Sequence, residues 1–401
     1  MPLIINYNRF LRKYGCLSIC VIILFSSVGC EKKKVLAKAV YKHVDRIDRG
    51  IKLVEHSDTL HFPLPPHTSN RISSFNCFKK DTINYIFFYD RGTKTMNIYD
   101  FHSGKLIKQT PLRSWIKSDN LDKATAYVRN FDSIYVATQN SFFLLDSSGT
   151  IKSKIRLTGK LDQPASINNI SPLVFVKNEI YVGMERTADE QSIRAQQEYE
   201  VLYGLDTENE IKKRYYSLPD IYQKSLYGYS FLNYGYCLND KGNFVFSFAA
   251  DTNIYETNLS DYHMAYSCKS KFQSGDITPI TKEDLKKTNS YKIYSLKDSY
   301  GAIFFDPYKK RYLRQAKQKM SEADYKSHEV RKKRSIIFMD KDFQIIGESE
   351  KPESFSFESI IFMDNGEIYG RANGMDMHAL HFVRLSYEEN DTSSQQMAQR
   401  N

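Results

Sequence analysis

The sequence lacks the short motifs by which many enzymes are recognised. It has no glycine-rich phosphate loop, no G-x-S-x-G nucleophile elbow, no H-E-x-x-H zinc motif and no calcium-binding loop. Histidine is also scarce, with 9 in 401 residues. We therefore predict no catalytic residue, no metal site and no cofactor, although an active site assembled from distant segments would carry no such motif.

Long apolar runs are equally scarce. The one prominent run is GCLSICVIILF at residues 15–25, well short of the roughly 20 apolar residues that cross a bilayer as a helix. Arg9, Arg12 and Lys13 precede it without any acidic residue, and small residues follow it. This pattern predicts a signal peptide over residues 1–29 that is removed on export.

The segment SVGC, which ends at Cys30, resembles the lipobox of bacterial lipoproteins. Leu is usual at the place of Ser27, so ordinary signal-peptidase cleavage stays open as the alternative. We predict that a lipid on Cys30 is the membrane contact and that residues 30–56 form the lipidated cysteine and a tether. The EKKK that follows favours the periplasmic side of the outer membrane over the cell surface, where acidic residues are usual after the cysteine.

Basic residues are in modest excess and scattered. The formal charge of +10 falls to +7 (10 − 3) when the three basic residues of the leader are removed. No basic helix is interleaved with stacking aromatic residues, so we predict no nucleic-acid partner.

Few cysteines remain for the exported part of the chain. Of six cysteines, two belong to the leader and one carries the lipid. The other three allow at most one disulfide and leave a free thiol: they are Cys77, Cys237 and Cys268. Cys237 and Cys268 are the pair to consider, and three free thiols are the alternative.

What is abundant is Tyr and Phe, with 29 and 25 residues, which favour β-structure. An apolar run that ends in Asp, then a turn, then another strand recurs along the chain. It begins at Met96, Phe142, Val201 and Ile336. Strands at intervals of about 45 to 65 residues are typical of propeller blades. A TIM barrel would require helices between the strands, and a β-sandwich would not require this repeat.

Six such units are predicted, and the fold class is therefore an all-β six-bladed propeller over residues 57–389. The units begin near Arg71, Lys123, Ala165, Ser225, Tyr291 and Ser354. The last unit has three convincing strands, so we predict that the N-terminal strand Thr59–Leu64 completes it and closes the ring. Residues 390–401 are polar and predicted to be a disordered tail.

Two polar insertions interrupt the repeat. They are residues 185–198 and 309–334, and the second contains a predicted short helix over residues 317–330. Such excursions lie over a propeller face, where binding loops usually sit.

A family resemblance rests on three features: the lipobox, the aromatic-rich units and the stretch YGAIFFDPY at residues 300–308, followed by Tyr312 and Arg314. Together they resemble a family of uncharacterised Bacteroidota lipoproteins with a propeller-like domain. The resemblance implies a six-bladed propeller outside the cytoplasm and no established activity.

The candidate ligand-binding residues come from the same stretch and are Asp306, Tyr308, Tyr312 and Arg314. Strand alternation places residues 308, 312 and 314 on one face. A guanidinium beside two phenols can hold a carboxylate, a phosphate or a sugar in the central channel. The alternative is a structural arginine that ties adjacent blades.

The histidines show no ligand pattern. In GMDMHALHF, Asp376 and His378 share one face of a strand and His381 points to the other, so the three do not converge. We predict edge histidines there. His56, His61 and His67 likewise have no ligand spacing.

These observations favour a non-catalytic lipoprotein of the cell envelope whose propeller face binds an unknown glycan, peptide or envelope protein. The alternative is a propeller enzyme, a lyase or hydrolase, with a metal in the central channel. That alternative requires His, Asp or Glu side chains from different blades to converge on one point.

Overall fold

The computed structural model describes residues 36–389, except 118, 187–190, 276, 329–330 and 375, and of residue 73 it describes the backbone alone. The predicted signal peptide, the lipidated Cys30 and the tail from residue 390 lie outside the described residues. These three therefore stay predictions.

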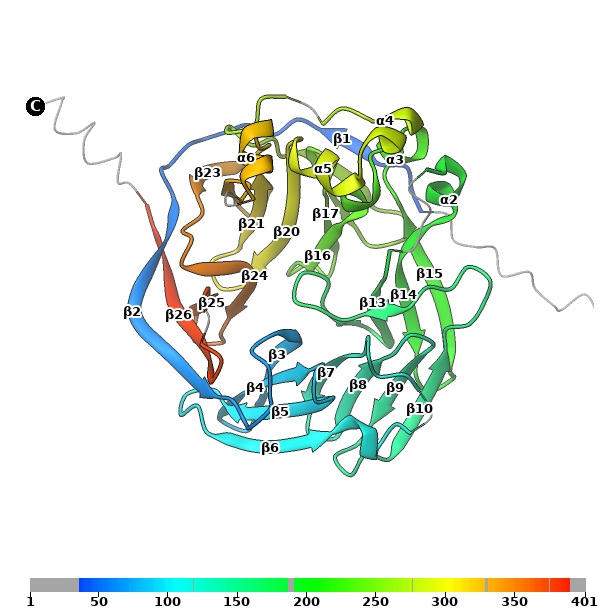
Figure 1. The fold of residues 1–401 in the computed structure, drawn as a ribbon, viewed down its shortest axis with the longest axis vertical. Helices are drawn as coiled ribbons and strands as arrows, with labels where there is room; N and C mark the ends of the chain where they lie inside the picture. Colours follow the sequence, from blue (N-terminus) through cyan, green and yellow to red (C-terminus); the bar gives the residue numbers. More distant parts are fainter. Residues whose placement is uncertain are drawn as a thin grey trace, which may run out of the picture. The chain divides into compact units, whose positions relative to one another are not determined.

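Six small sheets, antiparallel except for one parallel strand added at the edge of blade 4, form a ring, with the first strand of each blade near the centre and the last at the rim (Figure 1). Blade 1 consists of β3 (Ile72–Lys80), β4 (Ile83–Asp90), β5 (Thr95–Asp100) and β6 (Leu106–Pro111). Blade 2 consists of β7 (Thr125–Asn130), β8 (Ser133–Ala137), β9 (Ser141–Leu145) and β10 (Ile151–Arg156). Blade 3 consists of β11 (Ala165–Ser166), β12 (Val174–Val176), β13 (Glu179–Met184), β14 (Glu200–Asp206) and β15 (Ile211–Ser217).

The other three blades complete the predicted six-bladed propeller. Blade 4 consists of β16 (Tyr234–Leu238), β17 (Phe244–Phe248), β18 (Asn253–Thr257), β19 (His263–Ser267) and β1 (Val40–Lys42). Blade 5 consists of β20 (Ser299–Asp306), β21 (Arg311–Lys317), β22 (Arg334–Met339) and β23 (Ile345–Glu350). Blade 6 consists of β24 (Phe355–Phe362), β25 (Ile368–Ala372), β26 (Ala379–Glu388) and β2 (Lys52–Pro63).

The recurrent Asp at the strand ends stabilises the turns. The carboxylate of Asp100 accepts from the backbone N–H of Ser103 at 2.7 Å. The carboxylate of Asp340 accepts from the N–H groups of Asp342 and Gln344 at 3.0 and 2.9 Å. Such Asx turns add side-chain hydrogen bonds to the backbone hydrogen bonds that close the same turns, for example from the N–H of Gly104 to the carbonyl of Asp100. This role explains why the apolar-Asp-turn pattern repeats through the sequence.

Apolar side chains fill the space between neighbouring blades. Between blades 1 and 2, a cluster of buried residues includes Phe87, Ile98, Val136 and Phe143. Because each sheet packs on both sides, its strands are apolar on both faces, and the aromatic content of the sequence is used here.

The N-terminal strand closes the ring, as the sequence predicted. β2 pairs antiparallel with β26, from Lys52 opposite Glu388 to Pro63 opposite Ala379. Phe62 is buried beside Phe382, with 5.8 Å between the ring centroids. Residue 52 already belongs to the blade, so the propeller begins before residue 57.

Residues 37–51, here called the N-terminal strap, lie along the rim instead of forming a free tether. β1 pairs in parallel with β19, and the N–H of Ile47 donates to the carbonyl of Ile345 at 2.7 Å. In Figure 1 the strap passes along the outside of blades 4 and 5 before β2 begins. Its contacts are mostly backbone hydrogen bonds, which leave no apolar pattern in the sequence.

Short helices occupy the loops. They are α2 (Ile193–Glu198), α3 (Asp220–Lys224), α4 (Lys282–Lys287), α5 (Ser290–Ser295), α6 (Glu322–Ser327) and the 3-10 turns η1 (Leu112–Ser114) and η2 (Tyr229–Leu232). α6 falls inside the predicted helical stretch 317–330 and begins with a capping box between Ser321 and Asp324. None of the helices formed by the described residues is long and apolar enough to cross a membrane.

Candidate functional site

Arg314, the centre of the predicted site, lies in β21 and is fully buried, with 0% of its surface exposed. Its guanidinium donates to Ser247 Oγ at 3.0 Å and to the carbonyl oxygens of Asp251, Thr252 and Cys268 at 2.6, 2.7 and 3.2 Å. All four acceptors belong to blade 4. Arg314 therefore ties blade 5 to blade 4, as the structural alternative predicted, and does not line the channel.

Asp306 and Tyr312 are also structural. Tyr312 is buried, and its hydroxyl accepts from Asn239 Nδ2 at 3.1 Å. Asp306 is buried as well and accepts from the N–H of Tyr308 at 2.9 Å and from the hydroxyl of Tyr387 at 2.9 Å. The two faces of a blade pack against neighbouring blades, so alternation along β21 points these side chains at protein.

Tyr308 is the exposed member of the predicted set, at 45%. It lies in the turn between β20 and β21, away from the junction that buries Arg314. The four predicted residues thus do not share one open surface, and the prediction of a channel-lining ligand cluster needs this correction.

The cysteines considered as a disulfide do not pair. Cys77, Cys237 and Cys268 are free thiols. Cys237 lies in β16, the first strand of blade 4, and Cys268 directly follows β19, beyond two intervening strands. Neighbouring strands are about 4.8 Å apart, so strands at opposite ends of the sheet are too distant for a disulfide.

Asp376 and His381 do converge, contrary to the expectation from their spacing. His381 Nε2 lies 2.6 Å from Asp376 Oδ2. β26 begins at Ala379, so Asp376 lies in the preceding loop, where strand alternation does not apply. His61 on β2 lies directly opposite His381 and joins them. This proximity depends on how β2 and β26 are paired, which the sequence does not reveal.

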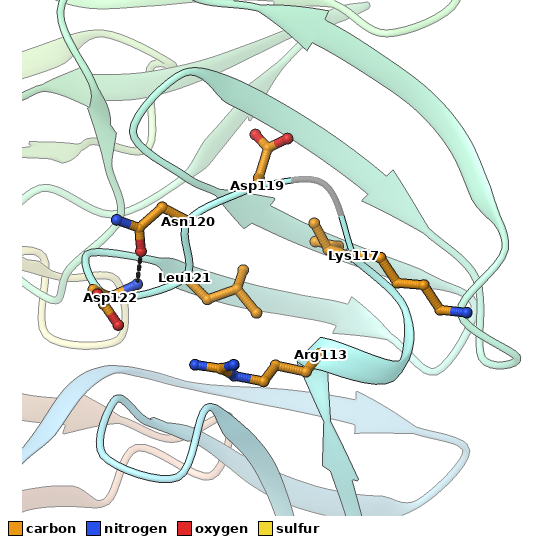
Figure 2. A pocket seen from close by; sticks show the side chains of 7 residues that line it. Arg113, Lys117, Asp119, Asn120, Leu121 and Asp122 are labelled. Atoms are coloured by element: carbon orange, nitrogen blue, oxygen red, sulfur yellow. Dashed lines mark hydrogen bonds between the residues drawn. The ribbon is translucent and has the colours of Figure 1, made fainter.

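One surface hollow, of about 470 Å³, lies beside η1 in the connection from blade 1 to blade 2 (Figure 2). Arg113, Asp119 and Asp122 are among its lining residues. The carboxylates already have cationic partners, since Asp122 pairs with Lys94 at 2.9 Å and Asp119 with Lys154 at 3.2 Å. This mixture of charges gives no preference for one class of ligand.

A second hollow, of about 360 Å³, has one sign of charge and lies at the end of blade 5 opposite the Tyr308 turn. We call it the aromatic–cationic pocket. It is lined by Tyr291, Tyr294, Ser295, Lys317, Met320, Tyr325, His328, Arg331, Lys332 and Arg334. No carboxylate is among these lining residues. α5 and α6, which supply its tyrosines, lie in the part of the ring formed by blades 4 and 5 (Figure 1).

Lys332 forms the inner wall of this pocket. Its Nζ donates to the carbonyls of Tyr294 and Lys297 at 3.0 and 2.7 Å and to Ser299 Oγ at 2.7 Å. Burial, together with the nearby cations Lys317 and Arg334, lowers the pKa of Lys332 to about 7. Three oxygen acceptors hold the amine in place and favour its protonated form over a neutral amine that could act as a nucleophile.

Arg331 and Arg334 contribute the two guanidinium groups of this pocket. Among the described residues, no side chain or carbonyl accepts a hydrogen bond from either group, and neither belongs to an ion pair. Lys317, the third neighbouring cation, pairs with Glu358 at 3.1 Å. Two guanidinium groups without a hydrogen-bonded acceptor among the described residues therefore line this pocket, and the nearby carboxylate of Glu358, which interacts with Arg334, is paired with Lys317.

Tyrosines form the outer wall. Tyr291 is the most exposed, at 67%, and its ring centroid lies 6.5 Å from that of Tyr325. Exposed aromatic rings of this kind offer flat apolar faces next to charged donors. The basic run 331–334 and the predicted helix were signals in the sequence, but only the packing of α5 against the strand ends gathers the whole pocket.

No complete metal-ligand set is present in the described part of the chain, because no three His, Cys, Asp or Glu side chains gather to hold an ion. The six closed blades define the class of the protein as a six-bladed β-propeller. Within that class, the chain belongs to the DUF4221 family, a domain of unknown function, whose family model matches residues 50–350. The resemblance to an uncharacterised family with a propeller-like domain is thus confirmed.

Solved structures agree with this assignment. A DUF4221 member from Bacteroides vulgatus is similar with a TM-score of 0.69 at 19% identity, over 84% of this chain and 99% of that one. A Bacteroides fragilis protein named as exported is similar with a TM-score of 0.52 at 10% identity, over 87% of this chain and 100% of that one. Among curated proteins, none matches the chain. At these identities the similarity concerns the fold alone.

Proposed function

We propose that this protein is a non-catalytic lipoprotein of the cell envelope whose aromatic–cationic pocket binds an acidic glycan. The observation that carries the proposal is a pair of guanidinium groups, Arg331 and Arg334, that have no hydrogen-bonded acceptor among the described residues and lie in a pocket with no carboxylate among its lining residues. The lipid on Cys30 and a position on the periplasmic side of the outer membrane belong to the same proposal.

The charge of the pocket supports an anionic ligand. Guanidinium forks bind carboxylate or sulfate groups through two parallel hydrogen bonds. Lys332, whose pKa is lowered to about 7, adds a positive charge behind them when its amine is protonated. Hydrogen bonds to charged groups contribute about 1.5–3 kcal/mol each. An anion in this pocket would supply the hydrogen-bond acceptors that the two guanidinium groups lack among the described residues.

The tyrosines favour a sugar over a peptide. The exposed ring of Tyr291 and the half-buried ring of Tyr325 present apolar faces beside the cations, and sugar rings pack their C–H faces on such surfaces. A volume of about 360 Å³ lies within the usual range for small-molecule sites, roughly 300–1,000 Å³. It has room for one or two acidic sugar units.

Calorimetric titration of the purified protein tests this proposal. The probes are oligogalacturonate as an acidic sugar, dextran oligosaccharide as a neutral sugar and polyglutamate as an acidic chain without sugar rings. We expect binding of oligogalacturonate alone, weakened at least tenfold by Arg331→Gln with Arg334→Gln. Arg113→Gln with Lys117→Gln in the hollow of Figure 2 is the charge-matched control and should have no effect.

Tyrosine variants separate sugar packing from charge. Tyr291→Ala should weaken oligogalacturonate binding, whereas Tyr308→Ala, equally a truncation of an exposed tyrosine, should not. Equal binding of dextran, or a pocket variant that binds as well as the wild type, would refute the proposal. Preferential binding of polyglutamate would replace the glycan with an acidic peptide.

A further inference from the structure

A second site, independent of the aromatic–cationic pocket, lies on the outer edge of blade 6. His61 of β2 and His381 of β26 are directly opposite each other in the antiparallel pair. Their ring centroids are 4.8 Å apart at an interplanar angle of 61°. The two Nδ1 atoms face each other at 3.5 Å.

That separation suits two ligands of one ion better than a direct hydrogen bond. An N–H donor and its acceptor usually lie about 2.9–3.0 Å apart, so 3.5 Å is at the outer limit. Two imidazole nitrogens at about 2.0–2.1 Å from a tetrahedral metal ion lie about 3.4 Å from each other. The backbone register alone holds the two rings at this spacing.

Asp376 fixes the state of the His381 ring. Its Oδ2 accepts from Nε2 at 2.6 Å, so Nε2 carries the proton and Nδ1 presents its lone pair towards His61. A histidine that ligates a metal through one nitrogen usually donates from the other to a carboxylate. The contact between Asp376 and His381 is therefore of the kind that orients a metal-binding histidine.

The loop that carries Asp376 is itself anchored. Its carbonyl accepts from Asn70 Nδ2 at 2.9 Å, and Asp376 Oδ1 accepts from the backbone N–H of His378 at 2.8 Å. The carbonyl of His378 accepts from the N–H of Leu64 at 2.7 Å. The backbone of the loop is thus anchored by Leu64 and Asn70, which follow β2, while the N–H of His378 holds the carboxylate itself.

We propose that His61 and His381 bind one divalent transition-metal ion through their Nδ1 atoms, with Asp376 as the positioning residue. No third side chain of the described residues joins them, so water completes the coordination and the ion exchanges with solvent. Imidazole ligands select Zn²⁺, Ni²⁺ and Cu²⁺, with Cu²⁺ bound most tightly, and reject Mg²⁺ and Ca²⁺.

Calorimetric titration of the metal-free protein with Cu²⁺, Zn²⁺ and Mg²⁺ tests the site. We expect one Cu²⁺ and one Zn²⁺ per chain at this site, Cu²⁺ the tighter, and no heat from Mg²⁺. His61→Asn and His381→Asn should each weaken binding at least tenfold, and Asp376→Asn about tenfold. His56→Asn is the matched control, because His56 lies on the same strand with its ring 2.7 Å from Ser386 Oγ.

A spectroscopic readout separates ligation from folding. The paramagnetic resonance spectrum of the Cu²⁺ complex should show two nitrogen donors in the wild type and one in either histidine variant. Thermal unfolding of the metal-free variants should match the wild type, because both rings are partly exposed. Absence of Cu²⁺ binding, or an equal loss in His56→Asn, would overturn the proposal.

Discussion

The guanidinium of Arg314 lies 3.8 Å from the centroid of the Tyr300 ring, at the junction of blades 4 and 5. The same cation engages one hydroxyl and three carbonyls of blade 4. The cation packs on an aromatic ring of blade 5 and donates its hydrogen bonds to blade 4. It therefore links two neighbouring sheets that are not joined by strand pairing. The closed ring therefore depends on a polar contact as well as on its apolar clusters.

Replacing Arg314 should destabilise the whole ring. Arg314→Met removes this donor from the buried carbonyls of Asp251 and Cys268, at about 1–3 kcal/mol for each unsatisfied group. The carbonyl of Thr252 keeps the backbone N–H of Cys268 as a donor at 3.0 Å. We expect a loss of about 3–5 kcal/mol in the free energy of unfolding, measured by urea denaturation, and an intermediate loss for Arg314→Lys. Arg311→Met on the same strand removes a partly exposed ion pair with Glu389 and should cost about 1 kcal/mol. Equal losses at both positions would contradict this role.

The blade architecture was predictable from the sequence because its signals are local. Turn-forming Asp residues and apolar strands recur in order, and the predicted unit starts near Arg71, Ala165 and Ser354 agree with the first strands of their blades. The predicted starts at Ser225 and Tyr291 fall instead on the end of α3 and in α5. In these two blades, helices precede the first strand, so a prediction based on strand patterns alone places the start of the blade too early.

The sites were less predictable because they depend on tertiary contacts. Alternation correctly placed Arg314 on one face of its strand, but the sequence does not say whether that face meets a neighbouring blade or the channel. The contact of His61 with His381 depends on the register of two strands separated by 320 residues. Neither relation has a sequence pattern of its own.

Glu348 should anchor the N-terminal strap. Its buried carboxylate accepts from Ser270 Oγ at 2.5 Å, Ser335 Oγ at 2.7 Å and the N–H of Lys271 at 2.7 Å, and it pairs with Arg46 of the strap at 3.3 Å. Glu348→Gln should cost about 1–3 kcal/mol.

Hydrogen exchange of the strap is the measurement that checks the role of Glu348. The amides of residues 37–51 should exchange faster in Glu348→Gln than in the wild type. Asp48→Asn breaks the exposed pair with Lys271 and should change stability by less than about 1 kcal/mol. Unchanged exchange in Glu348→Gln would show that backbone pairing alone holds the strap.

The three described thiols should be inert in the folded protein. Burial raises the pKa of Cys77, Cys237 and Cys268, and the thiolate is the reactive form. At pH 8, labelling with iodoacetamide followed by mass spectrometry should modify none of the three until guanidinium chloride is added, and then all three without a reductant. Reagent-resistant Cys237 and Cys268 in denaturant would show a disulfide instead.

Ligand affinity in the aromatic–cationic pocket should fall as pH rises above about 7. The pKa of Lys332 falls from its ordinary value of 10.5 to about 7, because burial and the nearby cations Lys317 and Arg334 outweigh the opposing effect of Asp298. A bound anion favours the ammonium form, so binding takes up a proton and weakens by up to about tenfold per pH unit above the pKa of the free protein. The same shift means that unfolded chains bind this proton more readily than folded ones between pH 7 and 10.5, so the contribution of Lys332 to stability increases with pH across that window.

Oligogalacturonate titrations at pH 7 and pH 9 should show the loss of affinity in the wild type and a flat profile in Lys332→Gln. A wild-type affinity that stays constant over this range would mean that Lys332 keeps its proton and that its three oxygen acceptors outweigh its burial.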